Sequence, residues 1–537
     1  MELLHKIRGY VVPGLVLLAL VFVALGARGS EGWYAGAGGV GLLLAVAVYD
    51  RVQRRHSILR NYPILGHFRF LLEGAGPELH QYFVESNISG RPFHRDHRSL
   101  MYERAKDIEG LKPFGTELDV YAPGYGFIGH SLATRPLVED PARTLRVDIG
   151  GPDCKAPYSA SVINISAMSF GALSGNAIAA LNQAARRGGF AHNTGEGGFS
   201  RHHQEPGGDV IWQVGTGYFG CRKSDGTFDV GMFREQAGED QVKMVELKLS
   251  QGAKPGHGGV LPGVKVTPEI AAARRVPVGE ECLSPPGHSA FRTPIELMEF
   301  IALLREESGG KPVGFKICIG NPVEFFSICK AMVQTGITPD FITVDGAEGG
   351  TGAAPVEFSN HLGFPLREGL LLVHNALVGV GLRDRLKLAA SAKRVGSYDI
   401  AAAMALGANW CNVARGFMFS LGCIQSQSCH TNRCPVGVAT QDARLEKALV
   451  VDDKAERALH FHQNTVKGLA EMTAACGLDH PNEFRPQHLY ERVSPHDLQR
   501  FDQLYDFFEP GELIRGEVGG RFGPLWDEAR ADDFSPT

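Results

Sequence analysis

The stretch VINISAMSFG, residues Val162–Gly171, decides the fold of this chain. It places a short apolar, β-branched run before a loop that is rich in Ser and Gly. The amphipathic stretch Ser174–Arg187 follows directly. This order predicts a buried strand, a connecting loop and a helix, which is the unit from which parallel sheets are built.

The same order recurs along the chain as far as Ala414. The eight candidate strands are Val162–Met168, Phe190–Asn193, Val210–Val214, Val245–Leu249, Gly314–Ile319, Phe341–Val344, Leu386–Ala390 and Trp410–Ala414. The further helical stretches are Pro294–Glu307, Pro322–Thr335, Leu366–Val380 and Ser397–Leu406. Eight such units match a (β/α)8 TIM barrel of about 250 residues, an α/β fold. A doubly wound open sheet is the alternative.

The N-terminal region is predicted to be a two-helix transmembrane hairpin. Tyr10–Ala27 and Trp33–Tyr49 each lack charged residues and approach the length that spans a bilayer, about 17–25 residues. Basic residues lie before and after the pair: Lys6, Arg8, Arg51, Arg54, Arg55 and Arg60. The positive-inside rule therefore predicts an inner (cytoplasmic) membrane protein whose catalytic domain is cytoplasmic, with residues 10–49 in contact with lipid.

The remaining chain divides around the barrel. We expect the hairpin at residues 1–55, a helical and irregular segment at 56–150, the barrel with a cysteine-rich loop at 151–441, and a C-terminal helical segment at 442–537. These pieces make the predicted fold a barrel with flanking helical segments. The net charge of -5 gives no nucleic-acid footprint. Ten cysteines in 537 residues do not form a disulfide scaffold, so a reducing compartment is expected.

Polar and Gly-rich loops follow several of the predicted strands. In a TIM barrel these strand ends form the active site. Lys316 lies within a predicted apolar strand, where a buried cation requires a negative partner. That partner is either a carboxylate or a flavin that gains negative charge on reduction. Ser391, Arg415 and Gly416 follow the last two strands, which is the usual phosphate-binding position. Lys254 lies among glycines and suits an anion.

A second diagnostic stretch, Leu421–Gln441, contains three closely spaced cysteines. Cys423, Cys429 and Cys434 are separated by five and then four residues. A single disulfide cannot use three thiols, and a zinc site would need a fourth ligand such as His430, in a spacing that zinc fingers do not show. The pattern favours an iron–sulfur cluster, either a three-iron (3Fe-4S) cluster or a four-iron (4Fe-4S) cluster with one ligand from outside the loop, and we expect 3Fe-4S of the two. Unrelated buried thiols are the alternative.

Together these motifs resemble the FMN-binding synthase domain of glutamate synthase. The stretches that carry the resemblance are Ser166–Ser174, Asn193–Gly198, Gln251–Gly259, Asp345–Pro355 and Gly422–Gln441. The resemblance spans about Val162 to Gln441. It implies a (β/α)8 barrel with FMN and a three-iron cluster. It also implies reduction of 2-iminoglutarate, formed from 2-oxoglutarate and ammonia, to glutamate.

The resemblance also implies roles for individual residues. The predicted cluster ligands are Cys423, Cys429 and Cys434. The residues expected around FMN are Met168, Ser169, Asn193, Thr194, Gln251, Lys316, Asp345, Gly346, Gly350, Ser391, Arg415 and Gly416. Lys254 and Arg274 are expected to hold the dicarboxylate substrate. The candidate catalytic residues are Lys254, Lys316 and Glu196.

The sequence also departs from the large synthases. We find neither an amidotransferase domain with a catalytic Cys after Met1 nor a dinucleotide-binding domain. The chain is closer to short, stand-alone glutamate-synthase-like FMN proteins. We therefore expect an oxidoreductase acting on CH-NH2 donors, with an external electron donor, either ferredoxin-like or a reductase subunit. Its acceptor would be a small 2-oxo acid or a related imine. The alternative is a membrane-tethered electron-transfer subunit without its own small substrate.

Overall fold

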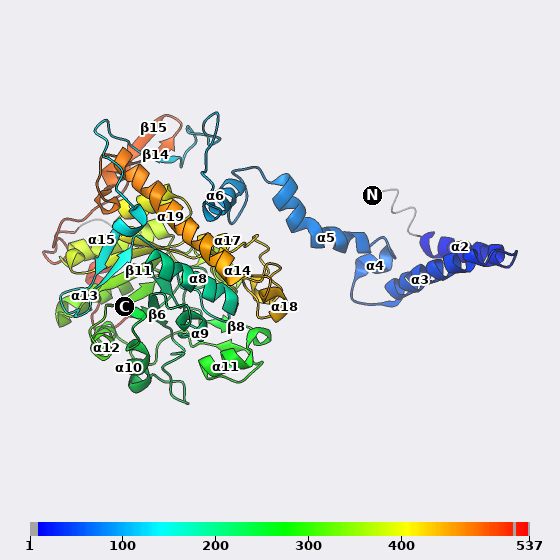
Figure 1. Ribbon diagram of the computed structural model, residues 1–537, viewed down its shortest axis with the longest axis horizontal. Coiled ribbons are helices and arrows are strands. Elements are labelled where there is room, and N and C mark those ends of the chain that lie inside the picture. Colours follow the sequence, from blue (N-terminus) through cyan, green and yellow to red (C-terminus); the bar gives the residue numbers. More distant parts are fainter. Residues whose placement is uncertain (1–8, 519–521, 535–537) are drawn as a thin grey trace. The chain divides into compact units, whose positions relative to one another are not determined.

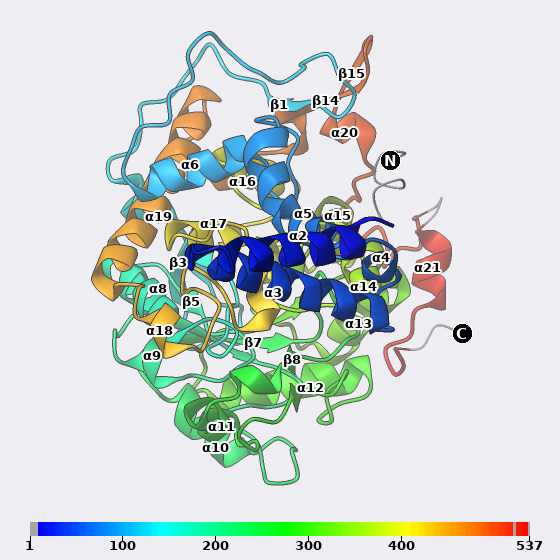
Figure 2. The ribbon, with the colours of Figure 1, turned by 90° about the vertical axis from the view of Figure 1, so that its right-hand side faces the viewer.

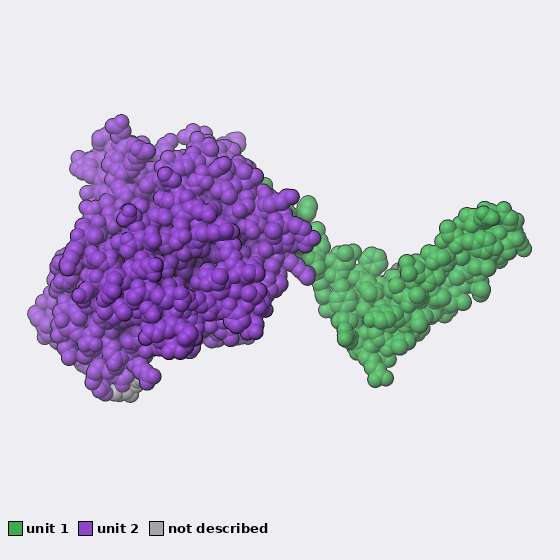
Figure 3. Space-filling view, turned by 60° about the horizontal axis from the view of Figure 1, so that its bottom comes forward, with its two compact units in different colours: residues 1–95 green, residues 96–537 purple. Residues whose placement is uncertain are grey.

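A computed structural model describes residues 9–518 and 522–534 of the chain. The chain forms two compact units, residues 1–95 and residues 96–537, which Figure 3 colours separately. The larger unit contains every residue that the sequence assigns to chemistry. Each unit is described here by itself.

Eight parallel strands in the larger unit close into a barrel, in the order β10-β11-β12-β13-β4-β5-β6-β7. Their bounds are β4 (Ile163–Ile165), β5 (His192–Asn193), β6 (Val210–Val214), β7 (Val242–Lys248), β10 (Val313–Ile317), β11 (Phe341–Asp345), β12 (Lys387–Ser391) and β13 (Trp410–Val413). All eight predicted strands are confirmed. The pairing of β13 with β4 closes the sheet, so the open-sheet alternative is excluded.

The barrel strands are apolar because both faces of a parallel sheet are buried. Every residue of β6, β10 and β11 is buried. Strand register sets which residues share a layer of the barrel. Lys316 in β10 lies opposite Lys248 in β7 on one side and Thr343 in β11 on the other. Polar side chains therefore meet inside the barrel near the carboxyl ends of its strands.

The predicted helices between strands are confirmed, and Figure 1 shows them around the sheet. They are α8 (Gly175–Gly188), α12 (Pro294–Glu307), α13 (Pro322–Thr335), α15 (Leu366–Gly379) and α16 (Ser397–Ala405). Their starts are capped by short polar side chains. Ser174 accepts a hydrogen bond from Ala177 N, and Thr293 forms a capping box with Glu296. Smaller helices are α9 (Arg201–Gln204), α10 (Val230–Ala237), α14 (Val356–His361) and η3 (Arg383–Arg385).

Two excursions from the barrel lie at the ends of its strands. Between β7 and β10 the chain forms β8 (Val260–Leu261), η2 (Gly263–Lys265), α11 (Pro268–Arg274) and β9 (Cys282–Leu283). We call residues 249–293 the β7–β10 insertion. After β13 come α17 (Arg415–Ser420), η4 (Cys429–Thr431) and α18 (Ala443–Glu446). We call residues 421–441 the cysteine loop.

The C-terminal segment begins with the long helix α19 (Val451–Ala475), which packs on α8. Beyond it the chain forms a hairpin, β14 (Leu489–Ser494) and β15 (Asp497–Arg500), to which β1 (Gly126–Ile128) adds a third strand. Figure 2 shows β1 beside this hairpin. The other elements are α6 (Arg95–Ala105), α7 (Pro141–Thr144), β2 (Arg146–Ile149), β3 (Tyr158–Ser161), η5 (Pro481–Glu483), η6 (Pro486–His488), α20 (Phe501–Leu504) and α21 (Gly523–Glu528).

The smaller unit contains the predicted helical hairpin, α2 (Val11–Gly26) and α3 (Gly32–Val52). The helices approach closely at Gly36, where an added Cβ would lie 3.1 Å from the Phe22 ring. By length and composition α3 could cross a membrane, and α2 is a shorter apolar helix. Large apolar side chains on both helices, among them Leu17, Leu20 and Leu42, are exposed. The helix pair is confirmed, whereas its place in a membrane stays a prediction.

A buried carboxylate organises the segment that follows the hairpin. Asp50, near the end of α3, is fully buried. It accepts hydrogen bonds from Ile64 N at 2.9 Å and from His67 Nε2 at 2.9 Å. Helices α4 (Ser57–Asn61) and α5 (His67–Leu79) and the π-helical turn η1 (His80–Val84) complete this unit.

Candidate active site

Two ion pairs, one buried and one partly buried, lie at the carboxyl ends of the barrel strands. Lys316 in β10 contacts Asp345 at the end of β11, with Nζ and Oδ2 3.2 Å apart. Lys248 at the end of β7 contacts Glu196 in the loop after β5, with Nζ and Oε1 2.9 Å apart. Burial alone would lower the pKa of Lys316, but Asp345 and the nearby Glu246 raise it above its ordinary value. Lys316 is therefore a buried cation with a carboxylate partner.

Glu246 lies at the centre of a hydrogen-bond network inside the barrel. Its Oε2 accepts from Asn193 Nδ2 at 2.7 Å and from Gln213 Nε2 at 2.6 Å, and its Oε1 accepts from Thr343 Oγ1 at 2.7 Å. The carboxylate is fully buried. Sequence reasoning missed both Glu246 and Lys248. The signal that marks them is a charged residue within an otherwise apolar strand, V-E-L-K. The same rule identifies Lys316.

A second group of cations faces Glu196 from the β7–β10 insertion. Lys254 and Arg274 are both buried, 3% and 5% exposed. Burial on its own would raise the pKa of Glu196, but Lys248, Lys254 and Arg274 together lower it. Glu196 is therefore ionised at neutral pH and is a counter-ion of these cations. The structure thus brings together three of the residues that the sequence assigned to substrate and catalysis.

Lys254 and Arg274 are incompletely paired within the protein. Among the described residues no carboxylate forms an ion pair with the Lys254 ammonium. Burial lowers the pKa of Lys254, Glu196 opposes that effect and Lys248 adds to it. The Arg274 guanidinium donates to Phe170 O at 3.1 Å and lies 5.1 Å from the Phe219 ring centroid. Its Nε is buried without a partner. Such cations fit an anionic ligand with more than one carboxylate.

The residues assigned to phosphate binding lie around the ends of β12 and β13. Ser391 Oγ is 3.3 Å from Ser166 Oγ. Burial lowers the pKa of Arg415 to about 10, and its guanidinium donates to Glu348 O at 3.3 Å. Gly350 lies against this guanidinium, since an added Cβ would be 2.9 Å from Nη1. The hydroxyl and guanidinium groups at this edge are donors of the kind that phosphate needs.

Other residues assigned to the flavin shape the loops. Gly416 is packed tightly, because an added Cβ would lie 2.6 Å from the Phe461 ring. Asn193 points to Glu246 inside the barrel. Thr194 is fully buried, and its hydroxyl accepts from Gln213 N at 3.1 Å. Asn193 and Thr194 thus support the barrel interior, whereas Gly416 lets α17 pack closely on α19.

The loops after β4, β7 and β11 also meet at the barrel mouth. Met168 is buried, and its N lies 3.4 Å from Asn193 O. Ser169 N lies 2.8 Å from where a Cβ on Gly195 would be. Gln251 is half-buried and precedes Gly252. Gly252 N donates to Asp345 Oδ2 at 2.9 Å, and the missing side chain lets its backbone approach Gly346 O.

The cysteine loop packs against the same end of the barrel. Gln441 Nε2 donates to Gly171 O at 3.2 Å and to Leu173 O at 2.8 Å, in the loop after β4. Tyr102 in α6 donates to Cys423 O at 2.6 Å. All ten cysteines are free thiols. The cysteine loop therefore lies beside the loop after β4, which carries the predicted flavin residues Met168 and Ser169.

The three thiols of the cysteine loop influence one another. Burial raises the pKa of Cys423 to about 12, with Cys429 and Cys434 adding to the rise. In residues 9–518 and 522–534, no three His, Cys, Asp or Glu side chains are grouped to hold one metal ion. A single zinc ion gathers its sulfurs at about 2.3 Å, whereas a cluster binds each thiolate at a separate iron. The iron–sulfur cluster therefore stays a prediction of the sequence.

Lys265 is a further charged residue that sequence reasoning missed. It ends η2 in the β7–β10 insertion and is 2% exposed. Burial lowers its pKa to about 8, while Cys429 and Cys434 oppose that shift. No local motif marks this lysine, because its neighbours come from segments far away in the sequence.

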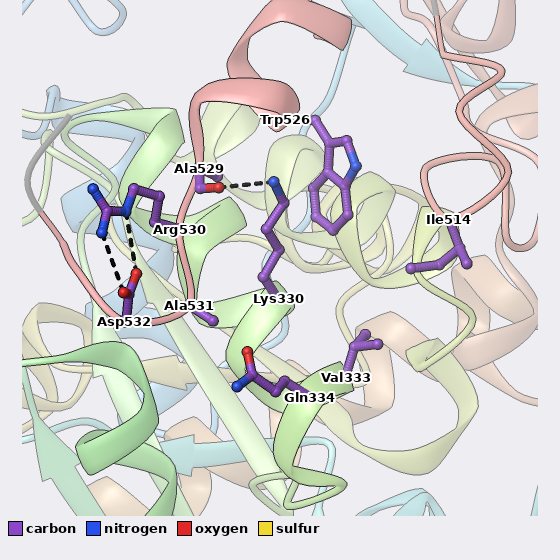
Figure 4. Close-up of a pocket in the computed structure, with 9 residues that line it drawn as sticks. All are labelled: Lys330, Val333, Gln334, Ile514, Trp526, Ala529, Arg530, Ala531 and Asp532. Carbon is purple, nitrogen blue, oxygen red and sulfur yellow. Dashed lines mark hydrogen bonds and ion pairs between the residues drawn. The ribbon is translucent and has the colours of Figure 1, made fainter. Parts of the chain in front are cut away.

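A separate hollow of about 530 Å³ lies outside the barrel, between α13 and the C-terminal segment (Figure 4). Lys330 Nζ donates to Ala529 O at 2.7 Å there and lies 4.8 Å from the Trp526 ring centroid. None of the residues assigned to chemistry lines this hollow. The candidate site is therefore the barrel mouth.

The chain is similar to known proteins over most of its length. Residues 153–479 match the conserved region in glutamate synthase. The chain is 38% identical to the glutamate synthase large subunit-like protein YerD of Bacillus subtilis, over 86% of this chain and 95% of that protein. It is 35% identical to an archaeal-type glutamate synthase [NADPH] of Thermotoga neapolitana, over 59% of each chain.

The large chain of glutamate synthase [NADPH] from Bacillus subtilis is also similar. It is 34% identical over 58% of this chain but only 20% of its own length. By the extent of the matched region and by its likeness to YerD, the chain belongs to the glutamate synthase-like family of oxidoreductases.

Proposed function

We propose that this protein is an FMN- and iron–sulfur-dependent oxidoreductase that reductively aminates 2-oxoglutarate, or a closely related 2-oxo acid. The observation that carries the proposal is the pair of incompletely paired cations, Lys254 and Arg274, at the mouth of the barrel. A dicarboxylate would provide the negative charges that these buried cations lack within the protein.

The residues at the mouth suit a flavin mononucleotide. Ser391, Ser166 and Arg415 offer donors to a phosphate, and Lys316 supplies a buried positive charge. FMN, when bound, supplies the electron pair as a hydride. The protein's own part is to orient the ring, to exclude water and to keep Lys316 charged through Asp345 and Glu246.

The three cysteines of the cysteine loop suit an iron–sulfur cluster, which supplies single electrons. We favour 3Fe-4S over 4Fe-4S because only three thiolates are available within the loop. An external donor, ferredoxin-like or a reductase subunit, would provide the electrons.

The overall reaction fits the charges at the site. Condensation of the 2-oxo acid with ammonia forms a C=N bond and releases water. Reduction then adds two electrons and two protons to that bond. Lys254 and Arg274 would hold the carboxylates of the substrate. Glu196, which is ionised and lies beside Lys248, would orient the ammonium groups of Lys248 and Lys254. Because the pKa of Lys254 is lowered by burial, this lysine also releases a proton more readily than an exposed lysine.

The proposal predicts that purified protein contains FMN, iron and sulfide. After reduction with dithionite under anaerobic conditions, 2-oxoglutarate plus ammonium should reoxidise the flavin, and glutamate should form in equal amount. Flavin absorbance follows the first step and chromatography the second. 2-Oxoglutarate alone is the matched control, because without ammonium the C=N bond does not form. Rapid reoxidation by an artificial acceptor but by no 2-oxo acid with ammonium would instead favour the electron-transfer subunit.

We also propose that α2 and α3 anchor the protein in the cytoplasmic membrane. The supporting observations are the uncharged α2, the length of α3 and the exposed apolar side chains on both. The full-length protein should remain in the membrane pellet after an alkaline carbonate wash. Leu20→Arg should release a large fraction, because an arginine at the centre of a span costs about 2.5–3.5 kcal/mol. Val333→Arg, an exposed change in the barrel unit, is the control. Full-length protein that is soluble without detergent would contradict the anchor.

A further inference from the structure

Three consecutive backbone carbonyls in the loop after β4 are held by side chains from two other segments. Gly171 O and Leu173 O accept from Gln441 at the end of the cysteine loop. Between them, Ala172 O accepts from Lys265 Nζ of the β7–β10 insertion at 2.9 Å. Lys265 thus lies where three segments meet: the predicted flavin loop, the insertion and the cysteine loop.

The ammonium of Lys265 faces the cysteine loop directly. The preceding residue, Val264, accepts a hydrogen bond through its carbonyl from Asn432 Nδ2 at 3.4 Å. Asn432 lies between Cys429 and Cys434, and both thiols interact electrostatically with Lys265. The insertion therefore lies against the part of the loop that carries two of the three cysteines.

Within the protein, Lys265 is poorly compensated. An ammonium has three N–H donors, and among the described residues Ala172 O is the one acceptor for them. No carboxylate in this part of the chain forms an ion pair with it. A buried cation with a single backbone acceptor is unfavourable unless negative charge lies beside it. Cys429 and Cys434, which interact electrostatically with Lys265, would supply that charge once they bind iron as thiolates.

We propose that Lys265 is a positioning residue whose fixed positive charge sets the reduction potential of the cluster on Cys423, Cys429 and Cys434. This inference rests on the proposed function, which supplies the cluster. A cation stabilises the reduced, more negative state of the cluster over the oxidised state. The same insertion also carries Lys254 and Arg274. One continuous segment of the chain therefore joins Lys265, beside the proposed cluster, to the proposed substrate pocket.

The test compares three variants of the full-length, cluster-loaded protein by redox titration monitored with electron paramagnetic resonance. Lys265→Gln keeps a donor for Ala172 O but removes the charge, whereas Lys265→Arg keeps the charge. Lys447→Gln changes an exposed lysine in the C-cap of α18 and is the matched control. Iron content is measured for each variant before titration.

We expect Lys265→Gln to shift the equilibrium between reduced and oxidised cluster roughly tenfold toward the oxidised state, a fall of 59 mV for a one-electron couple. Lys265→Arg and Lys447→Gln should keep the parental potential. Loss of iron from Lys265→Gln but not from Lys265→Arg would also support the inference, because it would show that the cluster needs the positive charge at this position. An unchanged potential in Lys265→Gln, or iron loss from both Lys265 variants, would overturn the inference. Absence of iron from the parental protein would instead refute the proposed function itself.

Discussion

Replacing Lys254 with alanine should lower kcat/KM for the 2-oxo acid by about 10²–10³-fold, since truncating one partner of a buried charge pair costs about 2–5 kcal/mol. Lys254 is buried, lies near Glu196 and has no carboxylate ion pair among the described residues. The loss should fall mainly on KM if the lysine holds the substrate in the ground state. Steady-state kinetics at varied 2-oxo acid concentration give kcat and KM separately.

Two controls make this result specific. Lys223→Ala removes an exposed lysine in the loop after β6 and should leave kcat/KM unchanged. FMN and iron contents of Lys254→Ala should equal those of the parental protein, so that lost activity is not lost cofactor. Turnover of Lys254→Ala at the parental rate would contradict an anion-binding role and would favour electron transfer to a protein partner.

The pH dependence of substrate binding should follow the same lysine. Because burial, opposed by Glu196, lowers the pKa of Lys254, its positive charge is present below that pKa and is lost as pH rises through it. KM for the dicarboxylate should therefore rise with increasing pH, and at a lower pH than an exposed lysine would cause. Lys254→Arg, which stays charged, should abolish this rise.

Replacing Glu246 with alanine should destabilise the barrel by at least about 3 kcal/mol, because it leaves three buried donors without an acceptor, at about 1–3 kcal/mol each. Those donors are Asn193 Nδ2, Gln213 Nε2 and Thr343 Oγ1. Lys316 would also lose one of the three carboxylates that keep it charged. Thermal unfolding monitored by circular dichroism and by flavin release should show the shift.

Thr343→Val is the matched comparison for that experiment. It removes one of the three hydrogen bonds and preserves the shape of the side chain, so the expected loss is about 1 kcal/mol. A Glu246→Ala protein that unfolds at the same temperature as Thr343→Val would show that the carboxylate has no special weight in the barrel.

The barrel strands could be predicted because most of them are short, largely apolar runs followed by a polar, Gly- or Ser-containing loop. The ends of the strands could be predicted less closely than their existence. Strand β4 ends at Ile165 rather than Met168, because the chain beyond it bends into the loop that meets the cysteine loop. Closure of the sheet could not be predicted locally, since it depends on the pairing of Cys411 with Ile163, which are distant in sequence.

The site could be predicted where a charged residue interrupts an apolar strand, as at Lys316. Glu246 and Lys248 follow the same rule. They alternate with apolar residues, however, and this pattern is also typical of a strand with one solvent-exposed face. Lys265 and its contacts lay beyond sequence reasoning for another reason. Its partners, Ala172 and the cysteine loop, lie on two other segments of the chain.

The small sheet of β1 with β14 and β15 has a consequence for how the chain is made. Arg492 Nε donates to Val120 O, a contact between residues 372 positions apart. A ribosome adds about 5–20 residues per second, so Val120 is synthesised roughly 20–70 s before Arg492. During that interval β1 lacks its partner β14, so its unpaired backbone groups are exposed to pairing with other chains.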